Sequence, residues 1–245
     1  MHVLITRPES DAAALRGELE ALGHTVTVEP LLTIRALPVP ADAVDGSAAL
    51  VATSRNALRA LARSPAFDAA KQLPLIAVGP GTAGLAQELG FTRVTFGKGT
   101  GADLVPAIVA IARELSGPIA HVRGKDVAFD LRGAVQGQGV DLREIVSYEA
   151  IAADRFGPGT RDLIASGVIN AVILMSPRTG SIFSRLARAE GLSKAAQSLG
   201  FLCLSPAVAA TVEPLGPTRV EIAESPDAAA MLDTVTRVET LWSGV

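Results

Sequence analysis

The sequence predicts an α/β protein built from parallel sheets that are covered by helices. Ten short apolar runs alternate with Ala-, Leu- and Arg-rich segments, and the connections between them are short. Strand–helix–strand alternation of this kind is typical of parallel sheets, because each helix carries the chain back to the start of the next strand. Ten strands fit either one large sheet or two five-stranded sheets, and a chain of 245 residues is long enough for both arrangements.

The predicted strands are short and apolar, and helical periodicity fills the segments between most of them. In residues 11–23, for example, Leu15, Leu19 and Leu22 recur at the spacing that places side chains on one face of a helix. The ten strands are predicted at residues 3–7, 25–30, 48–53, 75–78, 93–96, 118–123, 141–146, 171–175, 201–205 and 219–223.

Internal repeats favour two similar sheets over one large sheet. Three pairs of similar segments occur in the same order in both halves of the chain, which indicates a duplicated α/β unit. The alignment of the first pair also places Arg7 on Arg123, and the repeat alone suggests a boundary near residue 116. The pairs are LRGELEALG with LRGAVQGQG (15–23 and 131–139), TSRNALRALA with MSPRTGSIFSRLA (53–62 and 175–187), and VGPGTAGLAQELGFTRV with LSPAVAATVEPLGPTRV (78–94 and 204–220).

The composition excludes several classes of protein. The net charge of −3 argues against a broad nucleic-acid-binding surface. Cys203, the only cysteine, lies in the strand-like FLCLS and is predicted to be buried, and His2, His24 and His121 are too scattered for a metal site. The N-terminus lacks the pattern of a signal peptide, and no apolar run approaches about 18 residues. We therefore expect a cytoplasmic protein that does not span a membrane.

The segment GPGTAG raises the question of dinucleotide binding. Gly79, Gly81 and Gly84 spell G-x-G-x-x-G between a predicted strand and a predicted helix, which is the context of a Rossmann fingerprint. However, its repeat partner SPAVAA contains no glycine, and the first acidic residue after the next strand is Asp103, so the usual ribose ligand is missing. We therefore expect a tight turn that exposes backbone N–H groups at a helix N-terminus, with Thr82 near the cap.

Polar residues gather where the predicted strands end, which is where ligands bind in open parallel sheets. Hydroxyl side chains at these points are also the usual N-caps of helices, but a cap leaves neighbouring N–H groups free to hold an anion. Arginine binds carboxylates through two parallel hydrogen bonds. We therefore predict a cleft that suits a ligand with many carboxylates. The predicted ligand contacts are Arg7, Ser54, Gly81, Thr82, Arg123, Ser176, Arg178 and Ser205.

Tyr148 is the only tyrosine of the chain, and it follows the predicted strand 141–146 where the first half passes to the second. Two interpretations are open: a tyrosine wedged at a domain boundary, or a phenol that projects into the cleft. The chain contains no G-x-S-x-G, G-x-x-x-x-G-K-[ST], H-E-x-x-H or C-x-x-C motif, and no Cys–His or paired-carboxylate constellation stands out. An enzyme with this sequence would act by positioning and electrostatics.

Nine segments, taken in order, resemble the uroporphyrinogen-III synthase family and cover nearly the whole chain. Each segment is short, and the ordered set carries the resemblance. The segments are VLITRP, PLLTI, TSRNA, AVGPGTA, HVRG, VSYEA, MSPRT, CLSPAVA and VEIAESP.

The resemblance implies two flavodoxin-like parallel-sheet domains that are joined by a two-stranded linker. One domain would be discontinuous and the chain would cross between the domains twice, so the domains would not coincide with the two halves of the repeat. The implied domains are 1–31 with 152–245 and 37–146, and the implied linkers are 32–36 and 147–151.

The resemblance also implies a function. Members of this family are lyases of tetrapyrrole, porphyrin and heme biosynthesis, which cyclise hydroxymethylbilane to uroporphyrinogen III with inversion of the D ring and loss of water. They use no metal or cofactor and are typically monomeric. The family's cleft tyrosine matches Tyr148, which would donate a hydrogen bond to the leaving hydroxyl, and the family's substrate contacts match Ser54, Thr82 and Ser176.

One departure from the family keeps alternatives open. Residues 206–208 read PAV where the family often has hydroxyl residues, so a contact there would come from backbone N–H groups or from Ser205. One alternative is a non-catalytic homologue that binds a tetrapyrrole or another polyanion. Another is a nucleotide-dependent transferase, which rests mainly on GPGTAG and predicts that NAD, FAD or nucleotide sugars raise the melting temperature.

Overall fold

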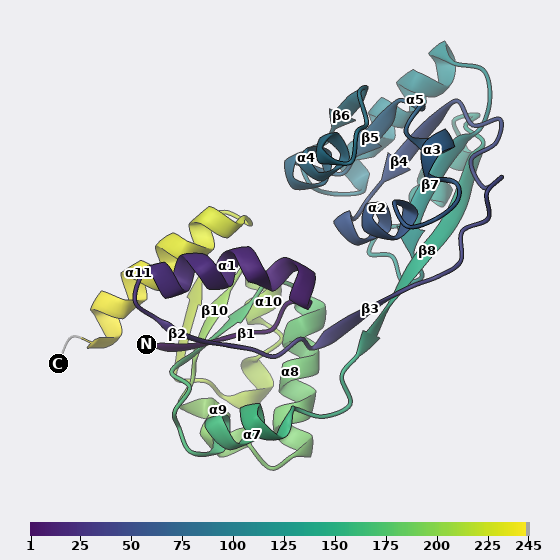
Figure 1. Cartoon of the computed structure of the whole chain (residues 1–245). Helices are drawn as coiled ribbons and strands as arrows, with labels where there is room; N and C mark the ends of the chain where they lie inside the picture. The colour runs from purple at the N-terminus through teal and green to yellow at the C-terminus, as the bar shows by residue number, and fades with distance from the viewer. Residues whose placement is uncertain (244–245) are drawn as a thin grey trace. The chain divides into compact units, whose positions relative to one another are not determined.

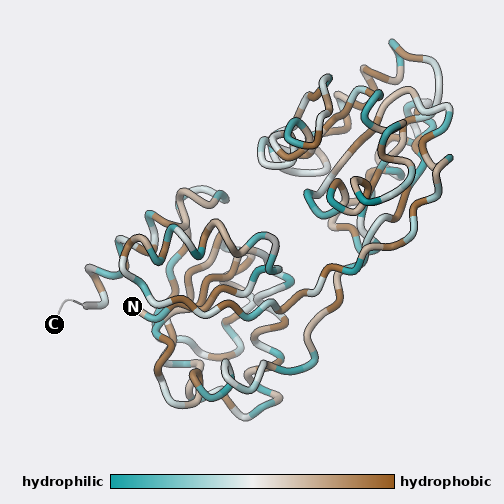
Figure 2. Tube along the Cα trace, viewed as in Figure 1, coloured by the Kyte–Doolittle hydropathy of each residue, from teal (hydrophilic) through white to brown (hydrophobic). Residues whose placement is uncertain are grey.

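The computed structural model of the chain describes residues 1–243 and divides into two compact units, each with its own sheet and its own core (Figure 1). The first unit comprises Met1–Thr33 and Ile151–Val245, and the second comprises Ile34–Ala150. The strands of each sheet are mainly hydrophobic, as Figure 2 shows, because both faces of each sheet are covered by helices. The predicted α/β class with parallel sheets is confirmed.

The first unit contains a five-stranded parallel sheet in the order β11-β10-β9-β1-β2. The helices α1 and α11 cover one face of this sheet, and α7, α8, α9 and α10 cover the other. The strands are β1 (His2–Ile5), β2 (Thr25–Val28), β9 (Ala171–Leu174), β10 (Gly200–Cys203) and β11 (Arg219–Ile222). The helices are α1 (Glu9–Ala21), α7 (Pro158–Ala165), α8 (Pro177–Ala189), α9 (Ser193–Gln197), α10 (Pro206–Ala209) and α11 (Ala228–Ser243), with a 3-10 turn at Glu213–Leu215.

Large aromatic side chains fill the core beneath α8. The ring of Phe183 packs edge-on against Phe156 and Phe201, with centroid distances of 5.3 and 5.6 Å. Cys203 lies in the same core and is fully buried, as predicted. Burial raises the pKa of the Cys203 thiol to about 12, so this cysteine acts as a small apolar side chain.

The second unit contains a six-stranded sheet in the order β3-β8-β7-β4-β5-β6. The helices α2, α3 and α4 cover one face, and α5 and α6 cover the other. The strands are β3 (Leu32–Ala36), β4 (Ala49–Ala52), β5 (Leu75–Ala77), β6 (Val94–Phe96), β7 (Ile119–Gly124) and β8 (Leu142–Ala152). The helices are α2 (Arg55–Leu61), α3 (Phe67–Ala70), α4 (Pro80–Glu88), α5 (Val105–Glu114) and α6 (Leu131–Gln136), with a 3-10 turn at Ala102–Leu104.

The pairing of β3 with β8 is the one part of the sheets that apolar runs do not predict. The amide of Leu37 donates to Ser147 O at 2.8 Å, and the amide of Ala153 donates to Leu31 O at 3.0 Å. One residue number rises as the other falls, so the two strands are antiparallel. Both segments are largely half-exposed or exposed, and neither therefore forms an apolar run. This explains why the apolar runs do not predict β3 and predict β8 only over 141–146, whereas the resemblance implies linker strands at 32–36 and 147–151.

The two sheets have the same topology when their strands are numbered by the sequence repeat. The repeat pairs β1 with β7, β2 with β8, β4 with β9, β5 with β10 and β6 with β11. In both sheets the order is then second, first, third, fourth, fifth. Each sheet combines the first two strands of one repeat with the last three strands of the other. This exchange explains why the repeat suggests a boundary near residue 116 and the compact units do not have one there.

The prediction that Leu15, Leu19 and Leu22 lie on one face of a helix is wrong for Leu22, which lies beyond the last residue of α1. Leu15 and Leu19 are buried, whereas Leu22 is 50% exposed. Helix α1 ends at Ala21, and Gly23 follows with a φ of +87°, a conformation that terminates helices. Leu22 is therefore the C-cap residue and no longer follows the helical face.

Candidate functional site

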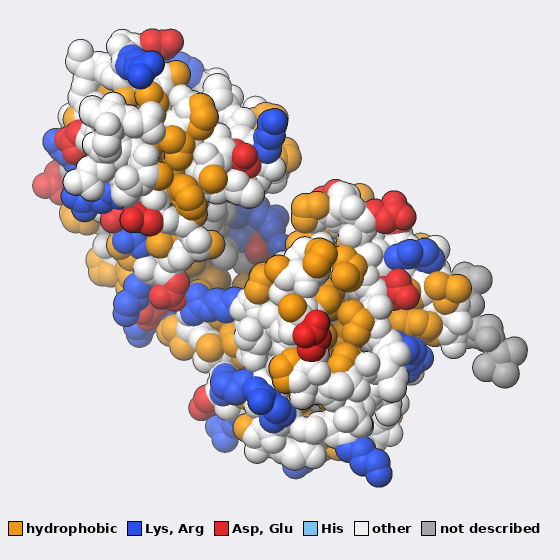
Figure 3. All heavy atoms as spheres, turned by 180° about the vertical axis from the view of Figure 1, so that it is seen from behind, with side chains coloured by type: hydrophobic (Ala, Val, Ile, Leu, Met, Phe, Trp, Pro, Cys, Tyr) orange, Lys and Arg blue, Asp and Glu red, His pale blue; other side chains and the backbone are white. Residues whose placement is uncertain are grey.

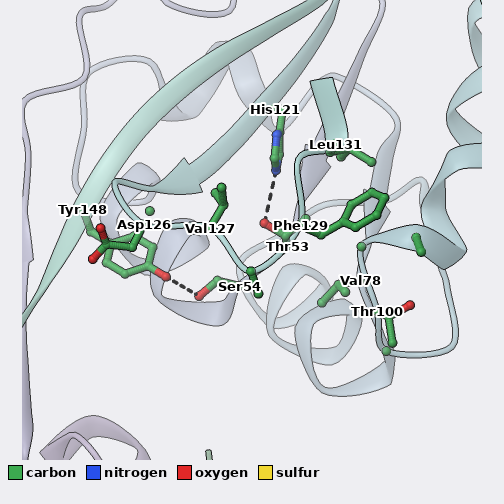
Figure 4. Close-up of a pocket in the computed structure, with 15 residues that line it drawn as sticks. Thr53, Ser54, Val78, Thr100, His121, Asp126, Val127, Phe129, Leu131 and Tyr148 are labelled. Carbon is green, nitrogen blue, oxygen red and sulfur yellow. Dashed lines mark hydrogen bonds between the residues drawn. The ribbon is translucent and has the colours of Figure 1, made fainter. Parts of the chain in front are cut away.

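A pocket of about 600 Å³ opens at the carboxyl edge of the sheet in the second unit (Figure 4). Its walls come from segments that follow β4, β5, β6 and β7, and from residues of β7 and β8 themselves. This is the edge at which parallel α/β sheets bind ligands. The lining residues include Thr53, Ser54, His121, Phe129 and Tyr148.

Two hydroxyl groups meet in one wall of the pocket. The phenol of Tyr148 donates a hydrogen bond to Ser54 Oγ at 3.1 Å, which Figure 4 marks with a dashed line. Ser54 is the N-cap of α2, and its Oγ also accepts a hydrogen bond from the amide of Asn56 at 3.1 Å. With both of these bonds accepted, the Ser54 hydroxyl keeps its own proton for a ligand. The helix cap thus fixes the partner of the phenol.

His121 forms a second, fully buried polar group of the pocket. The residue is 1% exposed, and its Nε2 lies 3.1 Å from Thr53 Oγ1 (Figure 4). Burial lowers the pKa of His121 to about 4, with Glu144 raising it and Arg123 lowering it to a smaller extent. The ring is therefore neutral at pH 7. A neutral ring hydrogen-bonded to Thr53 fixes the residue that precedes Ser54, and it adds no charge to the pocket.

The remaining wall is largely apolar. Val127 and Phe129 are 46% and 38% exposed, and together with Val78 and Leu131 they supply the apolar lining of the pocket (Figure 4). A Cβ built on Gly101 would lie 3.0 Å from Phe129 Cβ, so Phe129 can pack closely here only because residue 101 has no side chain. A pocket with one apolar wall and one hydroxyl wall suits a flat ring that carries a polar leaving group.

Three predicted contacts of the second unit lie outside the hydroxyl wall. Gly81 and Thr82 belong to the first turn of α4 and do not line the pocket, and the cap residue is Gly79. The amide of Thr82 donates to Gly79 O at 3.1 Å, so the turn itself uses one of the N–H groups expected for an anion. Arg123 binds Glu144, with its Nε 2.8 Å from Glu144 Oε1. Its guanidinium is therefore engaged within the protein.

Four predicted contacts lie at the carboxyl edge of the sheet in the first unit. Ser176 is the N-cap of α8, and its Oγ accepts from the amide of Thr179 at 3.2 Å. Arg7 lies 3.7 Å from the carboxylate of Asp11. Arg178 is in the first turn of α8, and Ser205 precedes α10 without a side-chain cap bond. These residues thus follow β1, β9 and β10, as predicted from the ends of the apolar runs.

Sequence reasoning missed several residues that build the pocket. The signal that could have identified His121 is its position within the otherwise apolar strand sequence IAHV, because a polar side chain in a buried strand needs a specific partner. Residues 99–102 and 126–129 carry no chemical motif, and only the fold brings these loops to the pocket. Within residues 1–243, no cluster of three or more His, Cys, Asp or Glu side chains is arranged to hold a metal ion. No helix in this range is long and apolar enough to cross a membrane.

The chain is similar to known uroporphyrinogen-III synthases in sequence and in fold. The family model described as uroporphyrinogen-III synthase HemD matches residues 13–233. The structure of uroporphyrinogen-III synthetase from Helicobacter pylori 26695 is similar in fold, with a TM-score of 0.68 and 17% identity over 97% of this chain and 99% of that chain. A mutant uroporphyrinogen III synthase from Thermus thermophilus gives a TM-score of 0.61 and 17% identity over 98% of this chain and 99% of that chain. No curated protein matches the sequence.

Proposed function

The chain belongs to the uroporphyrinogen-III synthase family, and from this premise we propose that Tyr148 and Ser54 assist the loss of water from its substrate. The activity is cyclisation of hydroxymethylbilane to uroporphyrinogen III, a lyase reaction of porphyrin and heme biosynthesis. The hydrogen bond between the two hydroxyl groups in the pocket is the observation that supports the proposal.

The chemistry requires help where the hydroxyl leaves. The bond between the terminal methylene carbon and its oxygen breaks, the oxygen takes a proton and departs as water, and an azafulvene cation remains. Attack by the substituted carbon of the D ring gives a spiro intermediate. The bond from this carbon to its original methylene then breaks, that methylene bonds to the free α-carbon of the D ring, and loss of the proton from this carbon restores the neutral pyrrole with the ring inverted. A hydrogen bond from Tyr148 or Ser54 to the leaving oxygen stabilises the negative charge that develops on it.

The shape of the pocket supports a ring-binding role. We propose that the apolar wall around Phe129 packs on a pyrrole ring of the substrate and that the hydroxyl wall faces the leaving group. A volume of about 600 Å³ accommodates part of a tetrapyrrole. The enzyme can therefore hold the reacting end of the chain away from water.

The carboxylates of the substrate require further contacts. We propose that the arginines and helix N-termini at the carboxyl edges of both sheets bind them, since arginine pairs with carboxylates bidentately. We also propose that 1–31 with 152–245 and 37–146 act as two domains, with 32–36 and 147–151 as linkers, and the antiparallel pairing of β3 with β8 supports this division. The proposed contacts are Arg7, Gly81, Thr82, Ser176, Arg178 and Ser205. Arg123, which the sequence also suggested, is left out because Glu144 and two backbone carbonyls hold its guanidinium.

The surface charges are mixed, and no broad basic surface for nucleic acid is seen on the visible face of either unit (Figure 3). Figure 3 shows basic side chains interspersed with acidic ones on the visible face of each unit, and the net charge is −3. We propose that the protein works as a cytoplasmic monomer without a nucleic-acid partner.

Product analysis tests the proposed function directly. We expect that incubation with freshly prepared hydroxymethylbilane gives uroporphyrinogen III as the main product, measured by chromatographic resolution of the isomers. The spontaneous reaction gives the uninverted type I isomer, so a product that is type I alone would contradict the proposal. Tight binding of the substrate with no isomer III would identify a non-catalytic homologue.

Replacement of Ser54 tests both roles of its hydroxyl. Ser54→Ala should lower kcat by about tenfold, because the phenol of Tyr148 loses its acceptor and the substrate loses a hydroxyl. It should also lower the free energy of unfolding by about 1 kcal/mol, because α2 loses its N-cap. Ser54→Thr keeps the hydroxyl and should retain both properties. A Ser54→Ala variant with the kcat of the wild-type protein would remove Ser54 from the mechanism.

A further inference from the structure

We propose that Gly124, together with a β-bulge at Ser147, is the positioning device that sets the phenol of Tyr148 against Ser54. The catalytic consequence rests on the proposed function of Tyr148. The position of the phenol itself can be tested without substrate.

The bulge decides which face of the sheet receives the tyrosine. Strands β7 and β8 pair in step from Ile119 with Leu142 to Arg123 with Val146, and the next pair is Gly124 with Tyr148. Ser147 is therefore an extra residue on β8. In an unbroken ladder Ser147 would oppose Gly124, and Tyr148 would point to the other face.

The displaced register brings Tyr148 to the side of α2. Tyr148 packs against the core cluster that contains Val122 and Ile145, on the face that α2 covers. Ser147 is fully buried, and its Oγ lies 3.3 Å from Arg123 O and 3.4 Å from Ala57 O of α2. These contacts occupy the hydroxyl of the extra residue and hold the bulge in place.

Gly124 leaves the space that the tyrosine ring needs. A Cβ built on Gly124 would lie 2.7 Å from Tyr148 Cζ and 2.9 Å from its hydroxyl oxygen. Both distances are shorter than real Cβ contacts, so any side chain at this position requires the phenol to move. The φ of Gly124 is not positive, and an alanine is therefore compatible with the backbone. The glycine is required for space and not for backbone conformation.

Hydrogen bonds hold the backbone around Gly124, so a side chain at this position is expected to displace the ring of Tyr148. Arg123 Nη1 donates to Gly124 O at 2.8 Å and to Lys125 O at 3.0 Å, and Arg123 Nη2 donates to Glu144 at 3.2 Å. The amide of Lys125 donates to Tyr148 O at 2.8 Å. A methyl group at Gly124 is therefore expected to displace the far end of the Tyr148 side chain and to leave the strands in place.

A spectroscopic experiment tests the position of the phenol. Tyr148 is the only tyrosine, so protein labelled with 3-fluorotyrosine gives a single ¹⁹F resonance from this ring. We expect Gly124→Ala to shift the resonance while the melting temperature stays close to that of the control. The control is Gly137→Ala, because Gly137 is in the same unit and a Cβ there would meet nothing within 4 Å. An unchanged resonance in Gly124→Ala would overturn the proposal.

A double-mutant cycle tests the catalytic consequence. Gly124→Ala should lower kcat by about tenfold or more, because small misplacements of a reacting group are costly. In a Tyr148→Phe background the same change should have no further effect on kcat, since the group that it displaces is absent. Additive losses would show that Gly124 acts elsewhere. If the wild-type protein makes no isomer III, the proposed function fails, and the resonance of the labelled tyrosine still decides the positioning role.

Discussion

Tyr148→Phe should lower kcat for formation of uroporphyrinogen III by about 100-fold, the usual effect of removing one hydrogen bond to a charge that develops in the transition state. The phenol reaches Ser54 Oγ at 3.1 Å in the wall of the pocket, and it is the only phenol in the chain. Phenylalanine keeps the ring over Gly124 and removes only the hydroxyl. The effect should therefore be on kcat more than on KM or on the fold.

The measurement is the initial rate of isomer III formation, together with the ratio of isomers III and I. As the enzyme slows, spontaneous cyclisation should raise the share of type I isomer. Thr95→Val is the matched control, because it removes a hydroxyl from the exposed edge strand β6. A Tyr148→Phe variant as fast as this control would exclude the phenol from the mechanism.

Much of the fold follows from short-range signals. Buried parallel strands such as β4 and β9 are continuous apolar runs, and the sequence predicts both. The repeat predicts two similar sheets, but the pairing of β1 with β9 depends on contacts between residues far apart in the chain. No local pattern encodes that exchange. The apolar runs do not predict strand β3, because it is largely exposed and carries Thr33 and Arg35; the family resemblance alone implies a linker strand at 32–36.

The site is less predictable than the fold, for a physical reason. The position of Ser54 follows from the end of a strand and the start of a helix, and Tyr148 from its place after an apolar run. Their contact depends on one extra residue in β8 and on a missing side chain at Gly124. A one-residue change of register reverses the faces of a strand, and hydrophobicity alone does not show where it occurs.

Acidification should destabilise the second unit through His121. The pKa of this ring is about 4 in the folded protein and 6.5 for an exposed histidine. Between these values the unfolded chain binds a proton that the folded protein does not, so stability is present above pH 6.5 and is lost as the pH falls towards 4. The difference corresponds to about 3 kcal/mol. The physical cause is that a charged ring would have to be buried at 1% exposure.

His121→Gln should remove this pH dependence, because an amide keeps a hydrogen bond to Thr53 and does not titrate. Urea unfolding at pH 7 and at pH 4.5 measures the change. The ¹⁹F signal of labelled Tyr148 reports on the second unit, and the fluorescence of Trp242, the only tryptophan, reports on the first. His2→Gln is the control, since His2 is only partly buried and lies in the first unit. If wild-type and His121→Gln proteins lose equal stability at Tyr148 on acidification, buried His121 is not the cause, and the loss must come from other groups of the unit.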